Sequence, residues 1–287
     1  MNQKKELKQY EQLTLADDFI FCKVFTTHHE LLKKLIEMIT GEEIDGFVEI
    51  NNQKSIKQTI DGKGIRCDVY AVESGRKIVY DIEMQTTKKR DLPRRARYYQ
   101  STIDSANLER GEDYAEIPNS YVVFLCTDPL FDGVDQLFCY EKRNFRHPYQ
   151  SMDDGTKTIF LTTKGHDRTL PKEVKEFLDY LDQGKLTSDF TKELEKAVFD
   201  AKQNRIWKEE FIMKSLIEMD AHYAGRNEGL AEGKAEGIAE GRNNTVYEFV
   251  SNGLISPEAG AKELQISVKE LKRRMKESGF NFVENGR

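Results

Sequence analysis

The sequence predicts an α/β protein that continues into an all-helical carboxyl-terminal arm. Short β-type runs separated by turn residues lie between residues 47 and 162, and helical patterns flank and interrupt them. After Gly165 the apolar residues follow only the helical period. The chain has 287 residues, enough for one large or two ordinary domains whose core needs no disulfide or metal to hold it.

The elements expected in order are a helix over 14–40, a β-tolerant stretch over 47–60, strands over 65–72 and 77–85, a helix over 91–111, and strands over 121–126, 134–141 and 158–162. Apolar side chains recur every three or four residues in the first helix, and Gly41 ends that pattern. A compact turn at 73–76 joins the first two strands into a hairpin. Residues 121–126 are continuously apolar, which indicates a central strand buried on both faces.

The carboxyl-terminal arm has three kinds of pattern. Residues 171–223 show helical periodicity, residues 225–241 repeat a glycine every four positions, and residues 245–279 predict two or three small amphipathic helices. We therefore expect an α/β domain over 1–167, a helical extension over 168–224, and a glycine-ladder helix with a small helical module over 225–287.

Composition excludes several classes of protein. The 44 Lys and Arg against 50 Asp and Glu give a net charge of −6, which excludes an overall basic coat but not a local basic patch. The four cysteines form no CxxC pair and predict buried thiols in a reducing cytosol. Residues 1–13 lack the apolar stretch of a signal peptide, and the apolar run 122–126 is too short to span a membrane. A cytoplasmic protein without a membrane partner is expected.

The strongest chemical signal is a row of polar residues on the hairpin. Asp81, Glu83 and Gln85 alternate along one strand and so share a face. Asp68, on the preceding strand, is expected to converge on them. Two converging carboxylates suit a hard divalent cation such as Mg²⁺, which keeps waters for substrate phosphates. The alternative is an ordinary hairpin with one solvated face.

A basic segment follows the hairpin directly. Residues 86–100 carry six basic residues and one acid, Asp91, in a chain whose overall charge is negative. Cations beside a carboxylate site suit a polyanionic substrate. A solvated helix face is the alternative for any such run. The candidate DNA-binding residues are Lys88, Lys89, Arg94, Arg95, Arg97 and Tyr98.

This order of elements resembles the αβββαβ core of the PD-(D/E)XK nuclease superfamily, which is restriction-endonuclease-like and has a mixed central sheet. More narrowly, the sequence is similar to the Rpn family of recombination-promoting nucleases, also called PD-(D/E)XK transposase-like proteins. The resemblance covers about residues 14–165. The matching pieces are Asp17-Asp18-Phe19 through Lys23-Val24-Phe25, Asp68-Val69-Tyr70-Ala71, Asp81-Ile82-Glu83-Met84-Gln85, Arg97-Tyr98-Tyr99 and Leu161-Thr162-Thr163-Lys164-Gly165.

The resemblance implies hydrolysis of double-stranded DNA by an endonuclease that depends on Mg²⁺, with Mn²⁺ as a substitute. Asp68 and Glu83 would be the metal ligands, and both would be catalytic together with Gln85. Gln85 stands where the superfamily name has lysine; it can orient water but brings no charge. Asp18 could add a carboxylate, or serve only as a first-turn acid of its helix.

Two further readings stay open. One is a catalytically weak or inactive DNA-binding or self-associating regulatory protein that keeps the nuclease fold. The other concerns the glycines from Gly225 to Gly241, which form either a flexible linker or a stripe that allows close helix–helix approach.

Because one metal site cuts one strand, we expect a homodimer or higher oligomer. Residues 257–276 read as a small packing module or a helix-turn-helix-like DNA reader.

Overall fold

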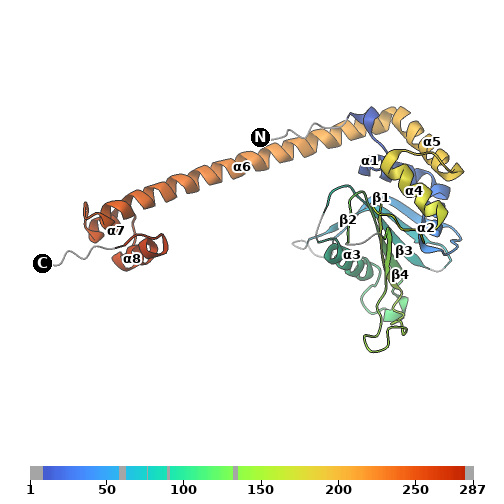
Figure 1. Cartoon of the computed structure of the whole chain (residues 1–287), viewed down its shortest axis with the longest axis horizontal. Coiled ribbons are helices and arrows are strands. Elements are labelled where there is room, and N and C mark those ends of the chain that lie inside the picture. The colour runs from blue at the N-terminus through green and yellow to red at the C-terminus, as the bar shows by residue number, and fades with distance from the viewer. Residues whose placement is uncertain (1–8, 58–62, 76, 89–90, 132–134, 282–287) are drawn as a thin grey trace. The chain divides into compact units, whose positions relative to one another are not determined.

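The computed structural model describes residues 9–57, 63–75, 77–88, 91–131 and 135–281. The chain divides between Ile212 and Met213 into two compact units, called unit 1 and unit 2. Unit 1 contains a six-stranded sheet with helices on both faces, and unit 2 is helical (Figure 1). The predicted α/β class with a helical carboxyl-terminal region is confirmed.

The elements of unit 1 are η1 (Tyr10–Gln12), α1 (Asp18–Thr27), α2 (His29–Thr40), β1 (Phe47–Ile56), β2 (Ile65–Glu73), β3 (Ile78–Gln85), α3 (Leu92–Ala106), η2 (Tyr114–Glu116), β4 (Asn119–Cys126), β5 (Leu137–Tyr140), β6 (Thr156–Thr162), α4 (Lys172–Gln183) and α5 (Asp189–Gln203). The helix expected over 14–40 is two helices, because His28 adopts φ −108° and ψ 79°, outside the helical region. Residue 134, where a strand was expected to begin, lies outside the described residues.

The sheet is mixed, with strand order β1-β2-β3-β4-β6-β5. Strand β2 runs antiparallel to both β1 and β3. Strands β3, β4 and β6 run parallel to one another, and β5 runs antiparallel to β6. Strand β4 lies in the middle of the sheet and is buried after its first residue. The prediction of a central, two-sided strand over 121–126 is therefore confirmed.

Two apolar cores lie on the two faces of the sheet. Helices α1 and α2 pack on one face together with α4 and α5, so these later helices share the core of the α/β unit. Helix α3 covers the other face through Leu92, Ala96, Tyr99 and Ile103, which recur at helical spacing. Figure 1 shows α3 on the side of the sheet opposite to α2 and α4.

Unit 2 is built from the later part of α6 (Arg205–Ser251), α7 (Pro257–Glu263) and α8 (Val268–Glu277). The expected glycine-repeat segment 225–241 lies within α6 and is helical. Helices α7 and α8 begin at N-caps Ser256 and Ser267, whose side chains accept backbone N–H groups. A small core forms between the three helices, and Gly260 is needed there because a Cβ would stand 2.6 Å from Val250.

Cysteine burial agrees with the sequence at three positions and disagrees at one. Cys22, Cys67 and Cys126 are buried, but the expectation of a buried thiol at Cys139 is wrong. Cys139 lies on β5, the strand at the edge of the sheet, where one side of the strand has no neighbour. Among the described helices, none is long and apolar enough to cross a membrane.

Candidate active site

The hairpin of β2 and β3 places Asp68 beside Glu83. Val69 pairs with Ile82, so Asp68, the residue before Val69 on β2, stands opposite Glu83, the residue after Ile82 on β3. Here side chains replace the regular ladder. The Asp68 backbone N–H donates to Glu83 Oε1 at 2.9 Å, and the Met84 backbone N–H donates to Asp68 Oδ2 at 3.0 Å. This reciprocal pair of bonds fixes both carboxylates where the strands separate.

The polar face of the hairpin is buried. Asp68 is 8% exposed, Glu83 1% and Gln85 6%, because α3 lies over this face. The alternative of an ordinary hairpin with a solvated face is therefore wrong. Buried carboxylates cost free energy unless they are neutralised or bind a cation, which favours a functional origin for this arrangement.

Asp81 belongs to this cluster but was not among the expected catalytic residues. It is fully buried, and neither of its carboxylate oxygens has a hydrogen-bond partner among the residues that the structure describes. The thiol of Cys67 is the nearby polar group that interacts with it. The signal was present in the sequence, since Asp81 precedes Glu83 by two residues on the same face of β3.

The pKa values of all three carboxyl groups are raised. Burial raises the pKa of Asp68, Asp81 and Glu83. Mutual repulsion adds to the rise, because Asp81 and Asp68 both raise the pKa of Glu83. The Arg95 guanidinium opposes it by lowering all three pKa values. Arg95 therefore offsets only part of the rise in pKa that burial and repulsion cause.

Arg95 lies in the site rather than on the surface of α3. Its Nη2 forms an ion pair with Glu83 Oε2 at 2.5 Å and donates to the Tyr99 hydroxyl at 2.7 Å. Its Nη1 donates to Gln85 Oε1 at 3.1 Å. The guanidinium also stands 4.9 Å from the centroid of the Tyr99 ring and 5.4 Å from that of Phe124. Arg95 therefore joins α3 to the carboxylates.

Gln85 is held firmly at the end of β3. Besides accepting from Arg95, it donates through Nε2 to Thr87 O at 2.7 Å and to Thr87 Oγ1 at 2.9 Å. A small hollow opens beside it, lined also by Lys88, Leu92 and the chain that follows β4. The amide is thus oriented by three hydrogen bonds at the rim of an open space.

Asp18 lies close enough to act on Asp68. It is the first residue of α1, and its carboxylate raises the pKa of Asp68. One turn later, the Cys22 thiol donates to the backbone oxygen of Asp68 at 3.2 Å, which anchors this face of α1 on β2. The structure thus brings Asp18 toward the pair formed by Asp68 and Glu83.

The remaining candidate DNA-binding residues lie outside the carboxylate cluster. Lys88, Arg94 and Arg97 are exposed, so they can reach a ligand in solvent. Tyr98 is 40% exposed and its hydroxyl donates to the backbone oxygen of Lys63. Lys89 lies outside the described residues.

The donor set fits a divalent cation. No cluster of three or more His, Cys, Asp or Glu side chains that could hold a metal occurs in the part of the chain that the structure describes. Mg²⁺ does not need one, because it usually takes one or two carboxylates and completes its shell with water and substrate phosphate. Asp68 and Glu83 are the two carboxylates that could take this part. Burial raises the pKa of Asp81 to about 7, and a cation bound nearby would favour the charged form of this carboxyl group.

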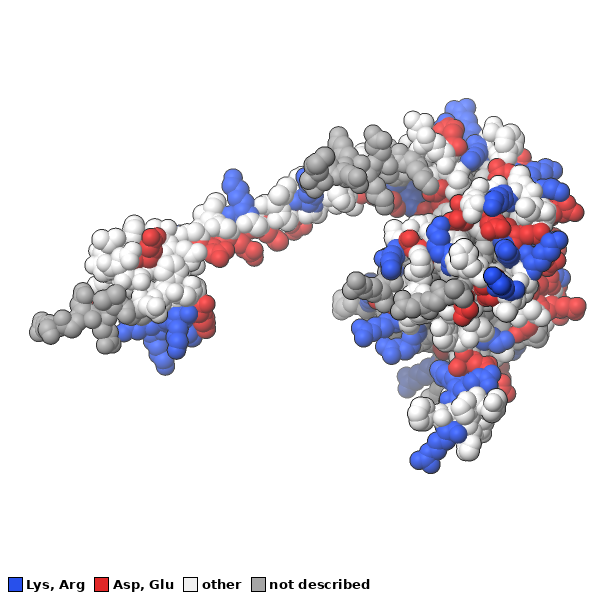
Figure 2. Space-filling view, in the orientation of Figure 1, with Lys and Arg blue, Asp and Glu red and all other residues white. Residues whose placement is uncertain are grey.

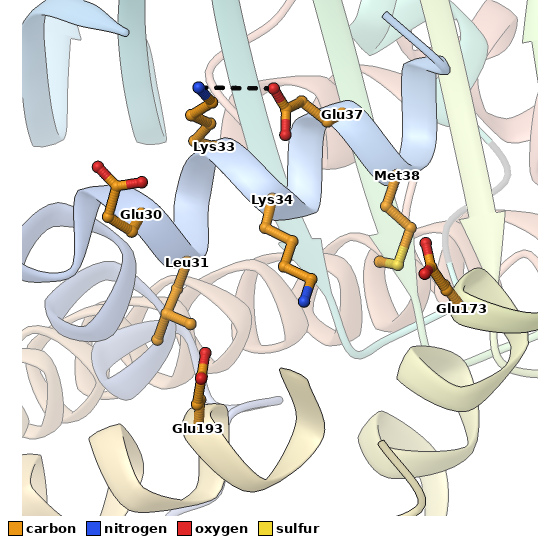
Figure 3. Close-up of a pocket in the computed structure, with 8 residues that line it drawn as sticks. All are labelled: Glu30, Leu31, Lys33, Lys34, Glu37, Met38, Glu173 and Glu193. Atoms are coloured by element: carbon orange, nitrogen blue, oxygen red, sulfur yellow. Dashed lines mark ion pairs between the residues drawn. The ribbon is translucent and has the colours of Figure 1, made fainter. Parts of the chain in front are cut away.

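A second hollow of unit 1 lies on the other face of the sheet, away from the carboxylates. It opens between α2, α4 and α5, and its rim carries both signs of charge (Figure 3). Lys33 forms an ion pair with Glu37 within α2, at 3.8 Å between Nζ and Oε1. The side chains at its rim include no convergent set of catalytic groups.

Comparison with known proteins identifies the fold of unit 1. The model of one protein family, described as PD-(D/E)XK nuclease family transposase, matches residues 15–163. The matched segment contains α1, all six strands and α3, and with them every carboxylate of the site. Searches of curated proteins and of solved structures give no match.

Proposed function

The chain belongs to the PD-(D/E)XK nuclease family transposases, and from this membership we propose that it is a Mg²⁺-dependent DNA endonuclease of the recombination-promoting type. Divalent metals and DNA substrates are general in this family of nucleases. The observation that carries the proposal is the buried pair Asp68 and Glu83: the Asp68 N–H donates to Glu83 Oε1, the Met84 N–H donates to Asp68 Oδ2, and Arg95 does not fully offset the rise in the pKa values of the two carboxyl groups.

In this proposal Asp68 and Glu83 hold the metal. When bound, Mg²⁺ would polarise the scissile phosphodiester and lower the pKa of the attacking water. Asp81 lies two residues before Glu83 on the same face of β3, and burial raises its pKa to about 7. Its burial keeps the site away from bulk water, which strengthens each electrostatic interaction within it.

Gln85 and Arg95 divide the work that lysine does in the superfamily motif. The Gln85 amide is fixed by Thr87 and Arg95, and it orients the attacking water through the remaining lone pair of its oxygen. Arg95 supplies the missing positive charge from α3, beside the scissile phosphate. Backbone and side-chain dipoles held in advance of the reaction stabilise the developing charge without further reorganisation.

The metal and the reaction can be tested together. We expect the purified protein to nick or linearise supercoiled plasmid in Mg²⁺ or Mn²⁺ and to leave it intact in EDTA. We also expect Mn²⁺ to raise the melting temperature, since a ligand at a hundred times its Kd adds about 2.7 kcal/mol to the free energy of unfolding. DNA binding without cleavage at any metal concentration would favour the regulatory alternative instead.

We assign the catalytic role to residues 1–167, a supporting role to the helical extension 168–224, and a role in self-association to residues 225–287. The free cysteines are in keeping with a reducing compartment, and we place the activity in the cytoplasm. Cleaving both strands of a duplex then needs two copies of the single metal site, related by a two-fold axis.

The glycine ladder of α6 is our candidate for the contact between copies. At each of its five glycines a Cβ would meet no atom within 4 Å, so packing within the chain does not require glycine there. Glycine costs a helix about 1 kcal/mol per residue relative to alanine, so the ladder needs another explanation. Leu230 and Ile238 between the glycines are 62% and 65% exposed, which leaves apolar surface for a second copy.

Replacing Gly229, Gly233 and Gly237 by Leu should abolish self-association, because the side chains keep two helices apart while raising helix propensity. The matched alanine variant raises helix propensity by as much or more but adds little bulk, and it should stay associated. Sedimentation velocity of both variants beside wild type measures the difference. A monomeric wild type, or a leucine variant as oligomeric as wild type, contradicts the assignment.

A further inference from the structure

The connection between β5 and β6 forms an exposed hairpin that we call the finger, residues 141–154. Every residue of the finger is exposed, so its side chains lie largely in solvent. Figure 1 shows it as the yellow-green loop that projects beyond the end of the sheet, and Figure 2 shows basic and uncharged side chains toward its tip, with acidic side chains near its base. The active site does not use this segment.

The finger is a built structure rather than an irregular loop. Its two sides are joined by backbone hydrogen bonds from Met152 N to Lys142 O at 2.8 Å and from Asn144 N to Gln150 O at 3.0 Å. Side chains reinforce the ribbon, because the Asn144 amide donates to Gln150 Oε1 at 2.9 Å and Lys142 pairs with Asp154 at 2.5 Å. The tip is therefore presented in a defined shape.

The tip carries two aromatic rings that the fold leaves entirely in water. Phe145 and Tyr149 are each 98% exposed. Single exposed apolar residues are common, but two rings at the end of an ordered ribbon form a concentrated apolar surface. Arg146 lies between them in the sequence and forms no ion pair with a described residue. Residues 143–150 contain no acid, so the tip is basic and aromatic together.

We propose that the finger enters a groove of duplex DNA and that Phe145 and Tyr149 contact the bases there. This inference rests on the proposed nuclease function and names the surface that grips its substrate. The major groove of DNA admits a two-stranded ribbon, and aromatic side chains make apolar contacts with base edges. The positive charge of Arg146 complements the phosphates that line the groove.

The finger leaves the sheet at the edge where β3 begins, whereas Glu83 lies toward the end of that strand. Thr156, at the base of the finger, pairs with Ser120, which pairs with Val79, four residues before Glu83 on β3. Strand rise and spacing put that base about 16 Å from Glu83. The ribbon extends away from Glu83, so its tip lies roughly 35 Å from it, a span of about ten base pairs of duplex DNA. Tyr140 anchors the finger on Phe131 and Phe160, on the face of the sheet that α3 covers. Arg95 reaches the carboxylates from that same face.

The test is the salt dependence of DNA affinity, measured by fluorescence anisotropy of a labelled duplex in EDTA with the full-length protein. Phe145→Ser combined with Tyr149→Ser should weaken binding at least tenfold without changing the slope of log affinity against log salt, because aromatic contacts release no counterions. Arg94→Gln combined with Arg97→Gln should instead flatten the slope by about one unit per lost phosphate contact. Tyr114→Ser, at another tyrosine that is 81% exposed, is the matched control.

The outcomes separate the finger from the nuclease. If the aromatic double variant binds DNA as tightly as Tyr114→Ser while wild type binds and cleaves, the finger proposal is overturned and the proposed function stands. A weakened variant whose salt slope has also fallen contradicts base contact by the rings. Wild-type protein that neither binds nor cleaves DNA overturns both. Because all substituted residues are exposed, unchanged melting temperatures should accompany every variant.

Discussion

Asp68→Asn should lower the rate of DNA cleavage about a thousandfold or more while leaving the protein folded. The substitution keeps the shape of the side chain, and the amide oxygen can still accept the Met84 N–H that now bonds Asp68 Oδ2. It removes the charge that the metal requires, and metal ions contribute several kcal/mol to phosphoryl transition states. The expected loss therefore falls on catalysis rather than on folding.

Asp68→Asn should also change the melting temperature of the protein in the absence of DNA. Asp68 raises the pKa of Glu83 by repulsion, so removing its charge relieves a crowded site. The metal-free melting temperature should stay level or rise, and the gain in melting temperature on adding Mn²⁺ should disappear. Plasmid cleavage and thermal melting measure these two effects.

Glu73→Gln is the matched control for Asp68→Asn. Glu73 is a buried carboxylate on the same strand, 1% exposed and bonded to the Tyr80 hydroxyl at 3.1 Å, outside the site. We expect it to cleave at the wild-type rate per folded molecule. Cleavage by Asp68→Asn at the rate of Glu73→Gln would refute the catalytic assignment.

The hairpin and its carboxylates were predictable because alternation in a strand fixes which side chains share a face. That rule placed Asp81, Glu83 and Gln85 together, and the short turn of the hairpin predicted that Asp68 converges on them. The family resemblance then selected Asp68 and Glu83 as the metal ligands. Alternation cannot say whether a face is covered. Burial of these residues depends on α3, which packs on them from elsewhere in the sequence, so burial of the polar face could not be predicted from the hairpin alone.

Arg95 shows how a charge run conceals two roles. Residues 86–100 form one basic run in the sequence, although the helical period divides it. Leu92, Ala96 and Tyr99 define the buried stripe of α3, and Arg95 lies beside that stripe, whereas Arg94 and Arg97 point to solvent. Reading the segment with a period of 3.6 separates the arginine of the site from those available to DNA.

Other parts of the fold gave weaker signals in the sequence. The change in pattern at Gly165 marks the end of the sheet, since β6 ends at Thr162. Packing of α4 and α5 on the core of α1 and α2 is a long-range contact that periodicity does not specify. The finger gave no signal, because exposed aromatic residues in a connection between strands look the same whether the loop is ordered or not.

Replacing Arg95 by Met should destabilise the metal-free protein by about 3 kcal/mol and lower cleavage about a hundredfold. The loss of stability follows because Glu83, whose side chain is 2% exposed, would keep a buried charge without its partner. The loss of activity follows because a cation held beside the reacting phosphate stabilises charge in the transition state. Urea unfolding and plasmid cleavage measure the two quantities separately.

Two further variants decide which role Arg95 plays. Adding Glu83→Gln to Arg95→Met removes the unpaired buried charge of Glu83. The free energy of unfolding should therefore recover, while DNA cleavage stays lost. Arg95→Lys keeps the charge but cannot bond Glu83, Gln85 and Tyr99 in one plane, so it should retain part of both properties. Arg94→Met, one residue away on the exposed face of α3, is the control and should leave stability unchanged. If Arg95→Met unfolds at the same urea concentration as Arg94→Met, Arg95 is not the counter-ion of Glu83 in solution, and the charge that replaces the missing lysine must come from another residue.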